Sequence, residues 1–421
     1  MRGLSLTAAT IAFGAALALL LAAPSPATAQ APAPQPSGAS PPITYRQALD
    51  LATAQNLELA AVRRARAVRE AEVRAAGQWA NPEFSGEITR DVPHGDLVIG
   101  LPVDISGRRS NRVAVAKAGL AMADVEVSNA MRQLRRNTRF AFYGVLAADE
   151  AMALAESVVQ VAQRFRDVAQ ARFDEGAAPR LDVMGAELGL VRAKADLNLA
   201  RSARRASQAD LNALLNRPPG LTIALAGEAF DVPALPTLDL ATSSALATNV
   251  DLVTLDREAA IETSMLGLLK AERVPMPTFS FGTALNAPGE FNVGPHAGVS
   301  IELPLFSRNQ GEIAGSLART DTIRARRDAL RRNVEARVYA AMERVTAQRA
   351  QVDAFRGTIV PTATALQGLA EESYTLGRTS VLAALEAQRS LRDIKYDYLQ
   401  ALLALQAAVA DLEDILGAPI Q

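Results

Sequence analysis

Apolar residues recur at strict seven-residue intervals along two long stretches of this chain. The longest series has five members, Val338, Val345, Val352, Ile359 and Leu366. Strict sevens sustained over several turns are typical of helices that pack as coiled coils. The pattern therefore predicts one long helix over residues 108–174 and another over 309–376. A helix of this length spans roughly 100 Å at about 1.5 Å per residue, far more than the core of one globular domain requires.

A glycine follows each long helix, and the seven-residue spacing then resumes. Gly176 precedes a predicted return helix over 180–216, and Gly377 precedes another over 380–417. Glycine adopts the left-handed backbone conformation that reverses a chain at little steric cost. Each long helix and its return helix are therefore predicted to form a hairpin that bends at the glycine. Pro361, inside the second long helix, is expected to kink it.

Two shorter segments change to an alternation of apolar and polar residues. Residues 82–104 and 277–305 both show this period of two. Turn-forming residues interrupt the first at 93–95, and a Gly/Pro-rich loop interrupts the second at 287–295. The pattern predicts two β-hairpins, whose strands of about nine to eleven residues would cross a bilayer when tilted. A soluble hairpin packed on a helical domain is the alternative, and the long flanking helices argue against it.

The chain carries the same plan twice. Three landmarks keep one spacing of 201 residues between the copies: an aromatic residue, the glycine of the bend and a proline near the end. The pairs are Phe173 and Tyr374, Gly176 and Gly377, and Pro218 and Pro419. Their common order and spacing indicate an internal repeat.

We expect repeat 1 to span 43–220 and repeat 2 to span 243–421, with a linker over 221–242. Each repeat should contain a first helix, a β-hairpin, a long helix and a return helix, in that order. The first helix of repeat 1 is predicted as one segment from about Thr44 to Gly77. The fold class is therefore mainly α with a small β part, built from two tandem structural repeats.

The N-terminus has the features of an export signal. Arg2 precedes an apolar stretch over 4–23, and small residues at 27–29 form a cleavage site. We predict a signal peptide over 1–29 and a disordered Pro/Ala-rich leader over 30–42. An uncleaved membrane anchor is the alternative, but the stretch is short and no stop-transfer charges follow it. No later run reaches the roughly 18 apolar residues of a membrane helix, so membrane insertion would have to use β-strands.

The composition removes several classes of chemistry. Cysteine is absent, which excludes disulfides, cysteine-based metal sites and thiol catalysis. Net charge is −1, with 44 Lys and Arg against 45 Asp and Glu, so no polybasic surface points to nucleic acid. The only histidines, His94 and His296, fall at or near the hairpin ends; we interpret them as solvated, with metal sensing as the alternative. We therefore predict no enzyme activity, no catalytic residues, no cofactor and no metal site.

Four strands in one chain cannot close a β-barrel, which predicts an oligomer. An open sheet edge in lipid would leave backbone groups without hydrogen bonds, at several kcal/mol each. Three copies would supply twelve strands, enough for a barrel with an aqueous lumen. The strands by themselves require an oligomer of any number; we predict a homotrimer with a periplasmic α-barrel of long helical hairpins and a 12-stranded β-barrel in outer-membrane lipid. Trp79 and Phe306, just outside the strands, are expected at the membrane interface.

The two bends and one strand-to-helix junction resemble those of the TolC-like outer-membrane efflux family. Residues 173–183 read FDEGAAPRLDV and residues 374–380 read YTLGRTS, similar to that family's periplasmic tip motif. Residues 303–313, LPLFSRNQGEI, are similar to the junction of its cobalt–zinc–cadmium (CzcC-like) branch. The resemblance covers nearly all of the chain after the leader. It implies a passive trimeric conduit docked to a periplasmic adaptor (membrane fusion) protein and an inner-membrane proton-driven efflux pump.

The resemblance also assigns roles at the tip. Relatives constrict the tip with acidic residues after the second glycine; here the nearer position is Ala383, a departure, and the farther is Glu386. Asp182 is the first-repeat counterpart, and Arg378 matches a tip arginine. These three charged residues are therefore candidates for the periplasmic gate, with ordinary solvated side chains as the alternative. The predicted adaptor-docking turns contain Gly176, Ala177, Gly377, Thr379 and Ser380.

The substrate implied by this branch is heavy-metal cations, and an acidic ring at the tip would favour cations. A multidrug duct and a type I secretion duct are alternatives, because the outer duct seldom selects the cargo. A periplasmic coiled-coil adaptor or scaffold without membrane strands is the alternative from another class. Two alternating hairpins of bilayer length favour the conduit.

Overall fold

The computed structural model of the protein describes residues 42–420 apart from 228–231, 233 and 288–290. The expected signal peptide and all but the last residue of the expected leader lie outside the described residues. Most described residues are helical, and four strands form an antiparallel sheet. Within the described part of the chain, none of the helices has the length and apolar composition of a membrane span.

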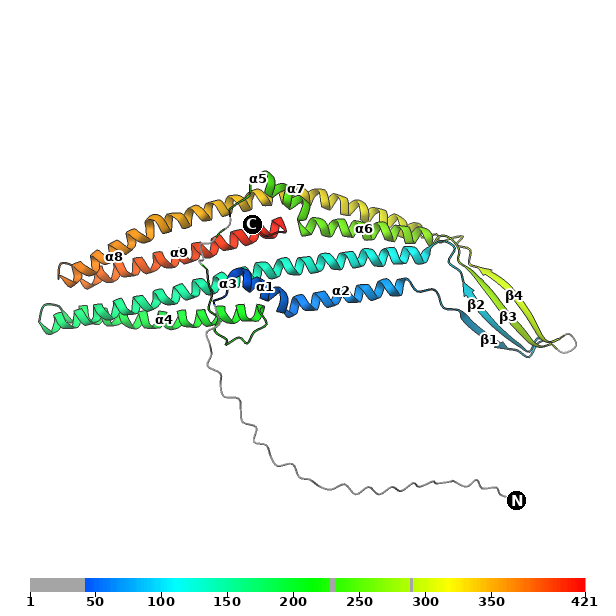
Figure 1. Ribbon diagram of the computed structural model, residues 1–421, viewed down its shortest axis with the longest axis horizontal. Coiled ribbons are helices and arrows are strands. Elements are labelled where there is room, and N and C mark those ends of the chain that lie inside the picture. Colours follow the sequence, from blue (N-terminus) through cyan, green and yellow to red (C-terminus); the bar gives the residue numbers. More distant parts are fainter. Residues whose placement is uncertain (1–41, 228–231, 233, 288–290, 421) are drawn as a thin grey trace, which may run out of the picture. The chain divides into compact units, whose positions relative to one another are not determined.

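Each half of the chain contains the same succession of elements (Figure 1). The first half contains α1 (Tyr45–Gln55), α2 (Leu57–Ala76), β1 (Glu83–Ile88), β2 (Gly95–Pro102), α3 (Arg108–Asp174) and α4 (Arg180–Leu214). The second half contains α5 (Leu238–Thr248), α6 (Val250–Ala271), β3 (Pro277–Ala287), β4 (Phe291–Ile301), α7 (Gln310–Ala354), the π-helical turn η1 (Phe355–Ile359), α8 (Val360–Thr375) and α9 (Val381–Leu416). The recurrence confirms the two-repeat architecture.

An asparagine breaks the first helix of each repeat, which corrects the single helix expected over 44–77. Asn56 ends α1 and caps α2, and Asn249 stands between α5 and α6 in the same way. The Oδ1 atom of each asparagine accepts hydrogen bonds from backbone N–H groups of the following helix. The side chain thereby takes the place of a helical carbonyl, so one helix ends and another begins.

The same asparagines join the first helix of each repeat to the return helix. Asn56 Nδ2 donates to the Leu214 carbonyl at 3.2 Å, and Asn249 Nδ2 donates to the Ile415 carbonyl at 3.0 Å. Leu214 and Ile415 are again 201 residues apart. The duplicated sequence therefore makes a duplicated contact.

The second long helix is interrupted, although one helix was expected over 309–376. The π-helical turn η1 separates α7 from α8, and Pro361 follows it as the second residue of α8. Proline lacks an N–H group and its ring crowds the preceding turn, so a wider turn accommodates it.

This π turn changes which members of the seven-residue series are buried. Val338, Val345 and Val352 are completely buried, whereas Ile359 and Leu366 are 37% and 55% exposed. A π turn contains one extra residue, so the apolar stripe beyond it rotates away from the core.

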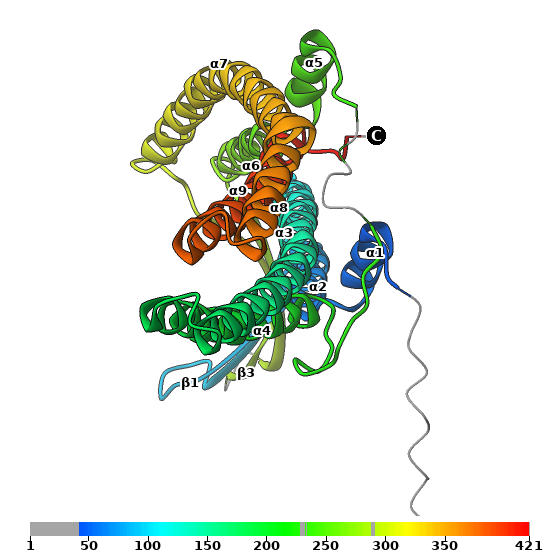
Figure 2. The same cartoon turned by 90° about the vertical axis from the view of Figure 1, so that its left-hand side faces the viewer.

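The long helices pack side by side, and the bends of both hairpins lie at the same end (Figures 1 and 2). α3 contacts α4 and α9, and α9 contacts α7 and α8, so the two repeats share one wall of helices. Buried apolar residues of α5, α7 and α9 form a large core cluster. α7 contributes one apolar stripe to this cluster, with Val334, Val338, Ala341, Val345 and Val352 buried.

Three arginines of α3 join the two repeats through acidic residues near the end of α9. The pairs are Arg132 with Asp414, Arg136 with Asp411, and Arg139 with Glu413, each at 2.8 Å. None of these pairs was anticipated from the sequence. They form a polar connection between α3 and α9 in addition to the apolar core.

Arg139 is the buried member of this group. It is 3% exposed, and its Nε donates to the Gln406 side-chain oxygen at 3.0 Å. Its guanidinium carbon lies 5.3 Å from the ring centre of Tyr45 on α1. Burial is the main cause that raises the pKa of Tyr45 to about 12. The ion pair is thus enclosed by both repeats and by the first helix.

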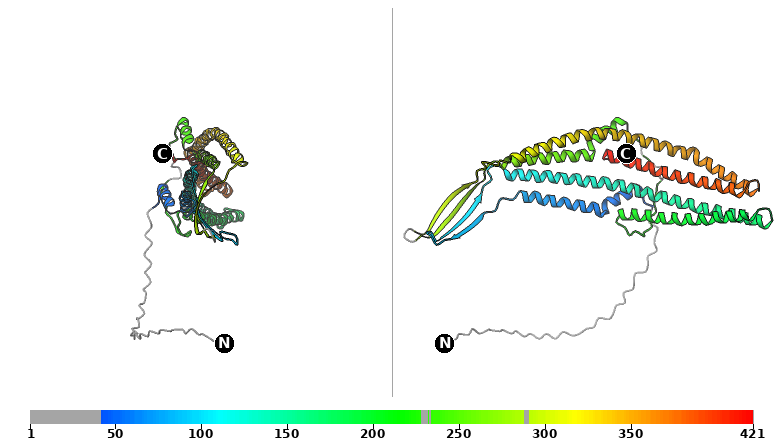
Figure 3. Two further views of the ribbon diagram at one scale, coloured as in Figure 1. Left: turned by 90° about the vertical axis from the view of Figure 1, so that its right-hand side faces the viewer. Right: turned by 180° about the vertical axis from the view of Figure 1, so that it is seen from behind.

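The strands form one sheet in the order β1-β2-β3-β4 (Figure 3). β3 and β4 have 11 residues each, but β1 and β2 have only 6 and 8, shorter than expected. β4 begins at Phe291, so the loop expected over 287–295 is also shorter than predicted. Pro295 pairs with Thr283 inside the ladder, in a strand that has a neighbour on one side within the described chain.

Candidate functional site

Both hairpin bends place glycine in the left-handed conformation. The backbone angle φ is 71° at Gly176 and 75° at Gly377. In each bend, the N–H groups of the glycine and of the next residue donate to carbonyls of the preceding helix, at distances between 2.8 and 2.9 Å. This Schellman arrangement satisfies the last carbonyls of the helix and reverses the chain.

The predicted docking residues lie in these bends and are exposed. They are Gly176, Ala177, Gly377, Thr379 and Ser380. Ser380 also caps α9, because its side chain accepts the N–H of Ala383 at 3.4 Å. The bends therefore present small side chains and backbone at the end of the helices.

Tyr374 anchors the four helices behind the bends. It is 1% exposed, and its ring meets Phe165 of α3 edge-on with 5.6 Å between ring centres. The guanidinium carbon of Arg172 lies 5.5 Å from the same ring, and Nη1 donates to the Tyr374 carbonyl at 3.4 Å. Burial raises the pKa of Tyr374; the charge of Arg172 opposes this effect and that of Asp182 adds to it. The sequence identifies Tyr374 only as a repeat landmark and gives no local signal for Arg172.

The three gate candidates lie near the bends, but one chain does not bring them together as ion pairs. Asp182 lies half-buried in the first turn of α4, close enough to act on Tyr374. Glu386 is exposed on α9, with Arg389 of the same helix 3.7 Å away. Arg378 is exposed in the second bend, and no ion pair involves it within the described residues. An acidic gate would therefore require neighbouring copies.

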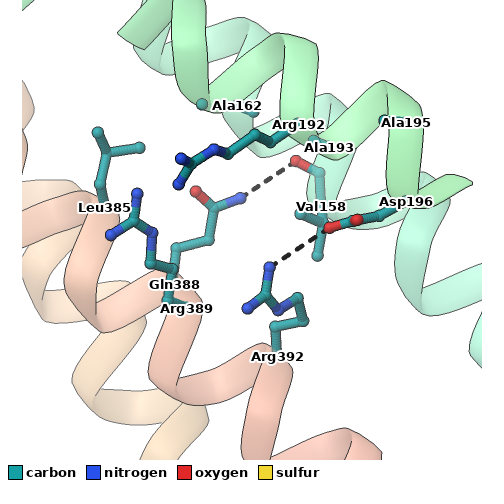
Figure 4. Close-up of a pocket in the computed structure, with 11 residues that line it drawn as sticks. Val158, Ala162, Arg192, Ala193, Ala195, Asp196, Leu385, Gln388, Arg389 and Arg392 are labelled. Carbon is teal, nitrogen blue, oxygen red and sulfur yellow. Dashed lines mark hydrogen bonds and ion pairs between the residues drawn. The ribbon is translucent and has the colours of Figure 1, made fainter. Parts of the chain in front are cut away.

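A basic groove lies between α4 and α9 behind the bends (Figure 4). Arg192 of α4 and Arg389 and Arg392 of α9 line this cavity of about 510 Å³. Arg392 pairs with Asp196 at 3.4 Å, and Gln388 donates to a carbonyl of α3 at 3.1 Å. Arg392 also pairs with Asp393 at 2.8 Å, and Arg389 lies 3.7 Å from the gate candidate Glu386, so acidic residues offset much of the charge of these arginines. Arginines three residues apart on a helix are too common for the sequence to single out this groove.

The two faces of the sheet differ in polarity, as the strand register shows, because residues paired across strands lie on one face. The apolar face carries Phe84, Ile88, Leu97, Ile99, Leu101, Phe279, Phe281, Leu285, Val293, Val299 and Ile301. The opposite face, called the polar face below, carries Glu83, Ser85, Glu87, Asp96, Thr278, Ser280, His296 and Ser300.

The predicted interface aromatics lie between helices and strands. Trp79, between α2 and β1, is 69% exposed, and the guanidinium carbon of Arg109 lies 4.4 Å from its ring centre. Phe306, between β4 and α7, is 95% exposed. Trp and Tyr rings collect at membrane–water interfaces, so the exposure of Trp79 is compatible with the predicted position.

His296 differs from its expected place near a hairpin end, since it lies inside β4. Its Nε2 is 3.7 Å from Asp96 Oδ1 on β2. Within the described residues, no three His, Cys, Asp or Glu side chains come together in a way that holds a metal ion.

The sequence matches one protein family model, outer membrane efflux protein, over residues 48–217 and 280–418. These segments make up well over half of the chain and include both helical hairpins. The chain belongs to the outer membrane efflux protein family. Efflux is a transport activity, so this family member is not an enzyme.

Two relatives of the family member are informative. Cobalt-zinc-cadmium resistance protein CzcC of Cupriavidus metallidurans is 26% identical over 400 residues, which cover 90% of this chain and 91% of the relative. Outer membrane efflux protein BepC of Brucella suis is 26% identical over 299 residues, which cover 67% of this chain and 64% of the relative.

Solved structures confirm the fold class of this family member. CusC gives a TM-score of 0.73 at 16% identity and covers 89% of this chain and 92% of its own. The outer-membrane channel OprN gives a TM-score of 0.72 at 18% identity, and the match covers 89% of this chain and 90% of the OprN chain. The open state of the Neisseria gonorrhoeae MtrE outer membrane channel gives a TM-score of 0.69 at 18% identity, and the match covers 90% of this chain and 89% of the MtrE chain.

Proposed function

We propose that this family member is the outer-membrane conduit of a tripartite efflux system. Three copies form one passive channel, which carries substrate from an inner-membrane pump and a periplasmic adaptor to the exterior. The signal peptide expected from the sequence delivers the chain to the periplasm, and the strands insert into the outer membrane.

The sheet is the observation that carries this proposal, because it is apolar on one face, polar on the other and open at both edges. β1 and β4 each have a neighbouring strand on one side only. In lipid, each open edge would leave N–H and C=O groups without partners. Joining β4 of one copy to β1 of the next removes every edge, and three copies close a barrel of twelve strands. The apolar face then meets lipid, and the polar face lines an aqueous lumen.

Two apolar rows remain exposed within the described part of one chain. The α4 row advances mainly by three and four residues, and the α8 row advances by seven and three, which are both spacings of a coiled-coil seam. The α4 row consists of Leu181, Met184, Leu188, Val191 and Leu199, all exposed. The α8 row consists of Leu366 and Leu369 of α8, together with Ile359 at the end of η1 and Leu376 just after α8, all exposed.

A second copy of this chain is the partner that suits both rows. α4 packs against α3 and α9, and α8 packs against α9, so the helices that carry the two rows belong to different sides of the helical wall (Figure 2). A flank-to-flank contact between copies covers the α4 row with the α8 row and repeats around a closed ring. The helices and the strands therefore support the same assembly.

Divalent heavy-metal cations are the substrate class that we favour. CzcC is a cobalt-zinc-cadmium resistance protein and aligns with 90% of this chain. The described strands contain the acidic residues Glu83, Glu87 and Asp96, all on the polar face, and no Lys or Arg. An anionic lumen attracts cations and repels anions.

The bends are the proposed docking surface for the adaptor, since they are exposed at the end of the helices. Asp182 and Glu386 form the proposed gate there, because threefold assembly places three copies of each carboxylate around one axis. Arg378 is exposed beside them and is free to pair with a neighbouring copy. Like charges around a narrow opening select for cations.

Neutralising the gate is expected to change the channel. Asp182→Asn combined with Glu386→Gln should raise single-channel conductance and lower cation selectivity in planar bilayers, because the charge at the narrow opening is lost. Asp321→Asn is the control, because it removes an exposed carboxylate near the start of α7, at the end of that helix away from the bends. Currents equal to those of the control variant would count against this gate.

Loss of the gene product tests the function itself. A host strain without this chain should tolerate less zinc, cobalt and cadmium and should retain more of each metal, and the wild-type chain should restore both properties. The restored protein should fractionate with the outer membrane and run as an oligomer in unheated gels. A water-soluble periplasmic monomer would overturn the proposal.

A further inference from the structure

His296 lies across the polar face of the sheet and reaches a strand that is not its neighbour. It belongs to β4, crosses β3 at Gly282, and places Nε2 3.7 Å from Oδ1 of Asp96 on β2. A Cβ atom at Gly282 would lie 2.6 Å from Nε2 and 2.7 Å from Cε1 of the imidazole. Only glycine at this position leaves room for the ring, so the contact depends on Gly282 as well as on its two partners.

One oxygen of the carboxylate at this site has no hydrogen-bond partner within the described chain. Asp96 Oδ1 is shielded from solvent and accepts no hydrogen bond there, and 3.7 Å is too long for a hydrogen bond to the imidazole. Glu87 lies directly across the strand pair from Asp96, on the same face. No Lys or Arg in the described strands offsets these two acids. The β1–β2 turn adds Arg90, Asp91 and His94.

The two facing atoms are those that a divalent transition metal prefers. Imidazole nitrogen and carboxylate oxygen bind zinc at about 2.0–2.2 Å, which keeps two ligands of a tetrahedral ion about 3.4 Å apart. The observed separation of 3.7 Å is close to that value. A metal ion would therefore fit between Nε2 and Oδ1 with a small adjustment of the side chains.

We propose that Asp96 and His296 form a two-ligand site for a divalent transition-metal cation on the lumenal face of the barrel. The inference rests on the proposed function, because it needs the polar face to line a water-filled lumen. Water completes the coordination, since no third protein ligand converges on the site within the described residues. Such a site holds a metal weakly, which suits a conduit because the ion must leave again.

The test uses the full-length protein reconstituted in planar bilayers, with K⁺ as the current carrier and ZnCl₂ as the probe. Zinc should reduce the K⁺ current reversibly in the wild type. His296→Asn should raise the half-blocking zinc concentration by at least about tenfold, the lower end of what loss of a supporting partner costs a metal site. His94→Asn is the matched control, because it removes the only other histidine and should leave the block unchanged.

Two further variants keep the test decisive if His296→Asn fails to assemble. Asp96→Asn removes the other ligand and should weaken the zinc block to a similar extent. Gly282→Ala removes no ligand, but its Cβ atom would meet the imidazole and, at 2.8 Å, the Leu97 carbonyl oxygen of the neighbouring strand, so it should weaken the block in those channels that assemble. A purely structural role of these residues would change assembly without changing the zinc dependence of assembled channels.

The outcomes separate this site from the proposed function. If the wild-type protein forms no conducting channel, the conduit itself is refuted. If cation-selective channels form but zinc blocks the His296→Asn and His94→Asn variants equally, the site is refuted and the conduit stands.

Discussion

Glutamate at both Leu188 and Val191 of α4 is expected to abolish assembly of the conduit, and metal tolerance with it. Both side chains are exposed within one chain and belong to the α4 row that a neighbouring copy would cover. Two charges buried there without partners would cost several kcal/mol each, and about 1.4 kcal/mol already changes an association constant tenfold. Unheated gel mobility and crosslinking of outer-membrane extracts measure the loss of oligomer.

The controls for this prediction lie on the same helix and on the proposed partner. Lys194→Glu also adds negative charge to an exposed site of α4, but outside the α4 row, and should assemble normally. Glutamate at Leu366 and Leu369 of the α8 row should reproduce the defect. If the Leu188 and Val191 variant assembles as well as Lys194→Glu, the α4 row is not a subunit interface.

Arg139→Met is expected to lower the free energy of unfolding by about 3–5 kcal/mol, because it leaves a buried carboxylate without its cation. Among the described residues, Glu413 would retain the backbone N–H of Ile420, at 3.2 Å, as its hydrogen-bond donor. The methionine side chain keeps the apolar contacts of the arginine stem, so the loss reports mainly the charge. The midpoint of urea unfolding in detergent, followed by circular dichroism, measures the change.

Two comparisons isolate that charge effect. Adding Glu413→Gln to Arg139→Met removes the unpaired charge and should recover most of the loss. Arg136→Met makes the same change three residues earlier on α3, where the partner Asp411 and the arginine are partly exposed. That pair should contribute no more than about 1 kcal/mol. Equal losses in Arg136→Met and Arg139→Met would contradict the argument from burial.

Local patterns were sufficient to predict most elements of this fold. Period seven identified the long helices, period two identified the hairpins, and Gly176 and Gly377 marked both bends. These features are local, because a helix or strand exposes the same face to its partner again and again along its length. The alternation of apolar and polar residues also predicted which side of each strand is apolar, without knowledge of the neighbouring strands.

Interruptions inside elements escaped these patterns. The apolar period continues across Asn56, so only the capping hydrogen bonds reveal that one helix ends there and another begins. The series through Val352 and Leu366 is regular in the sequence. Val352 is nevertheless buried and Leu366 is exposed, because the π turn before Pro361 lies between them. A spacing rule assumes one unbroken helix, and these positions violate that assumption.

By itself, the sequence determined the helices, the hairpins, the duplicated plan and the absence of cysteine chemistry. Only the tertiary structure decided the contacts between residues far apart in the chain. Arg139 and Glu413 are separated by 274 positions, and neither carries a local mark of its partner. The same holds for His296 and Asp96, which meet because β3 lies between them with glycine at position 282. The hydrophobic period and the composition indicate which face each segment buries. Which side chains pair with one another depends on which segments the fold brings together.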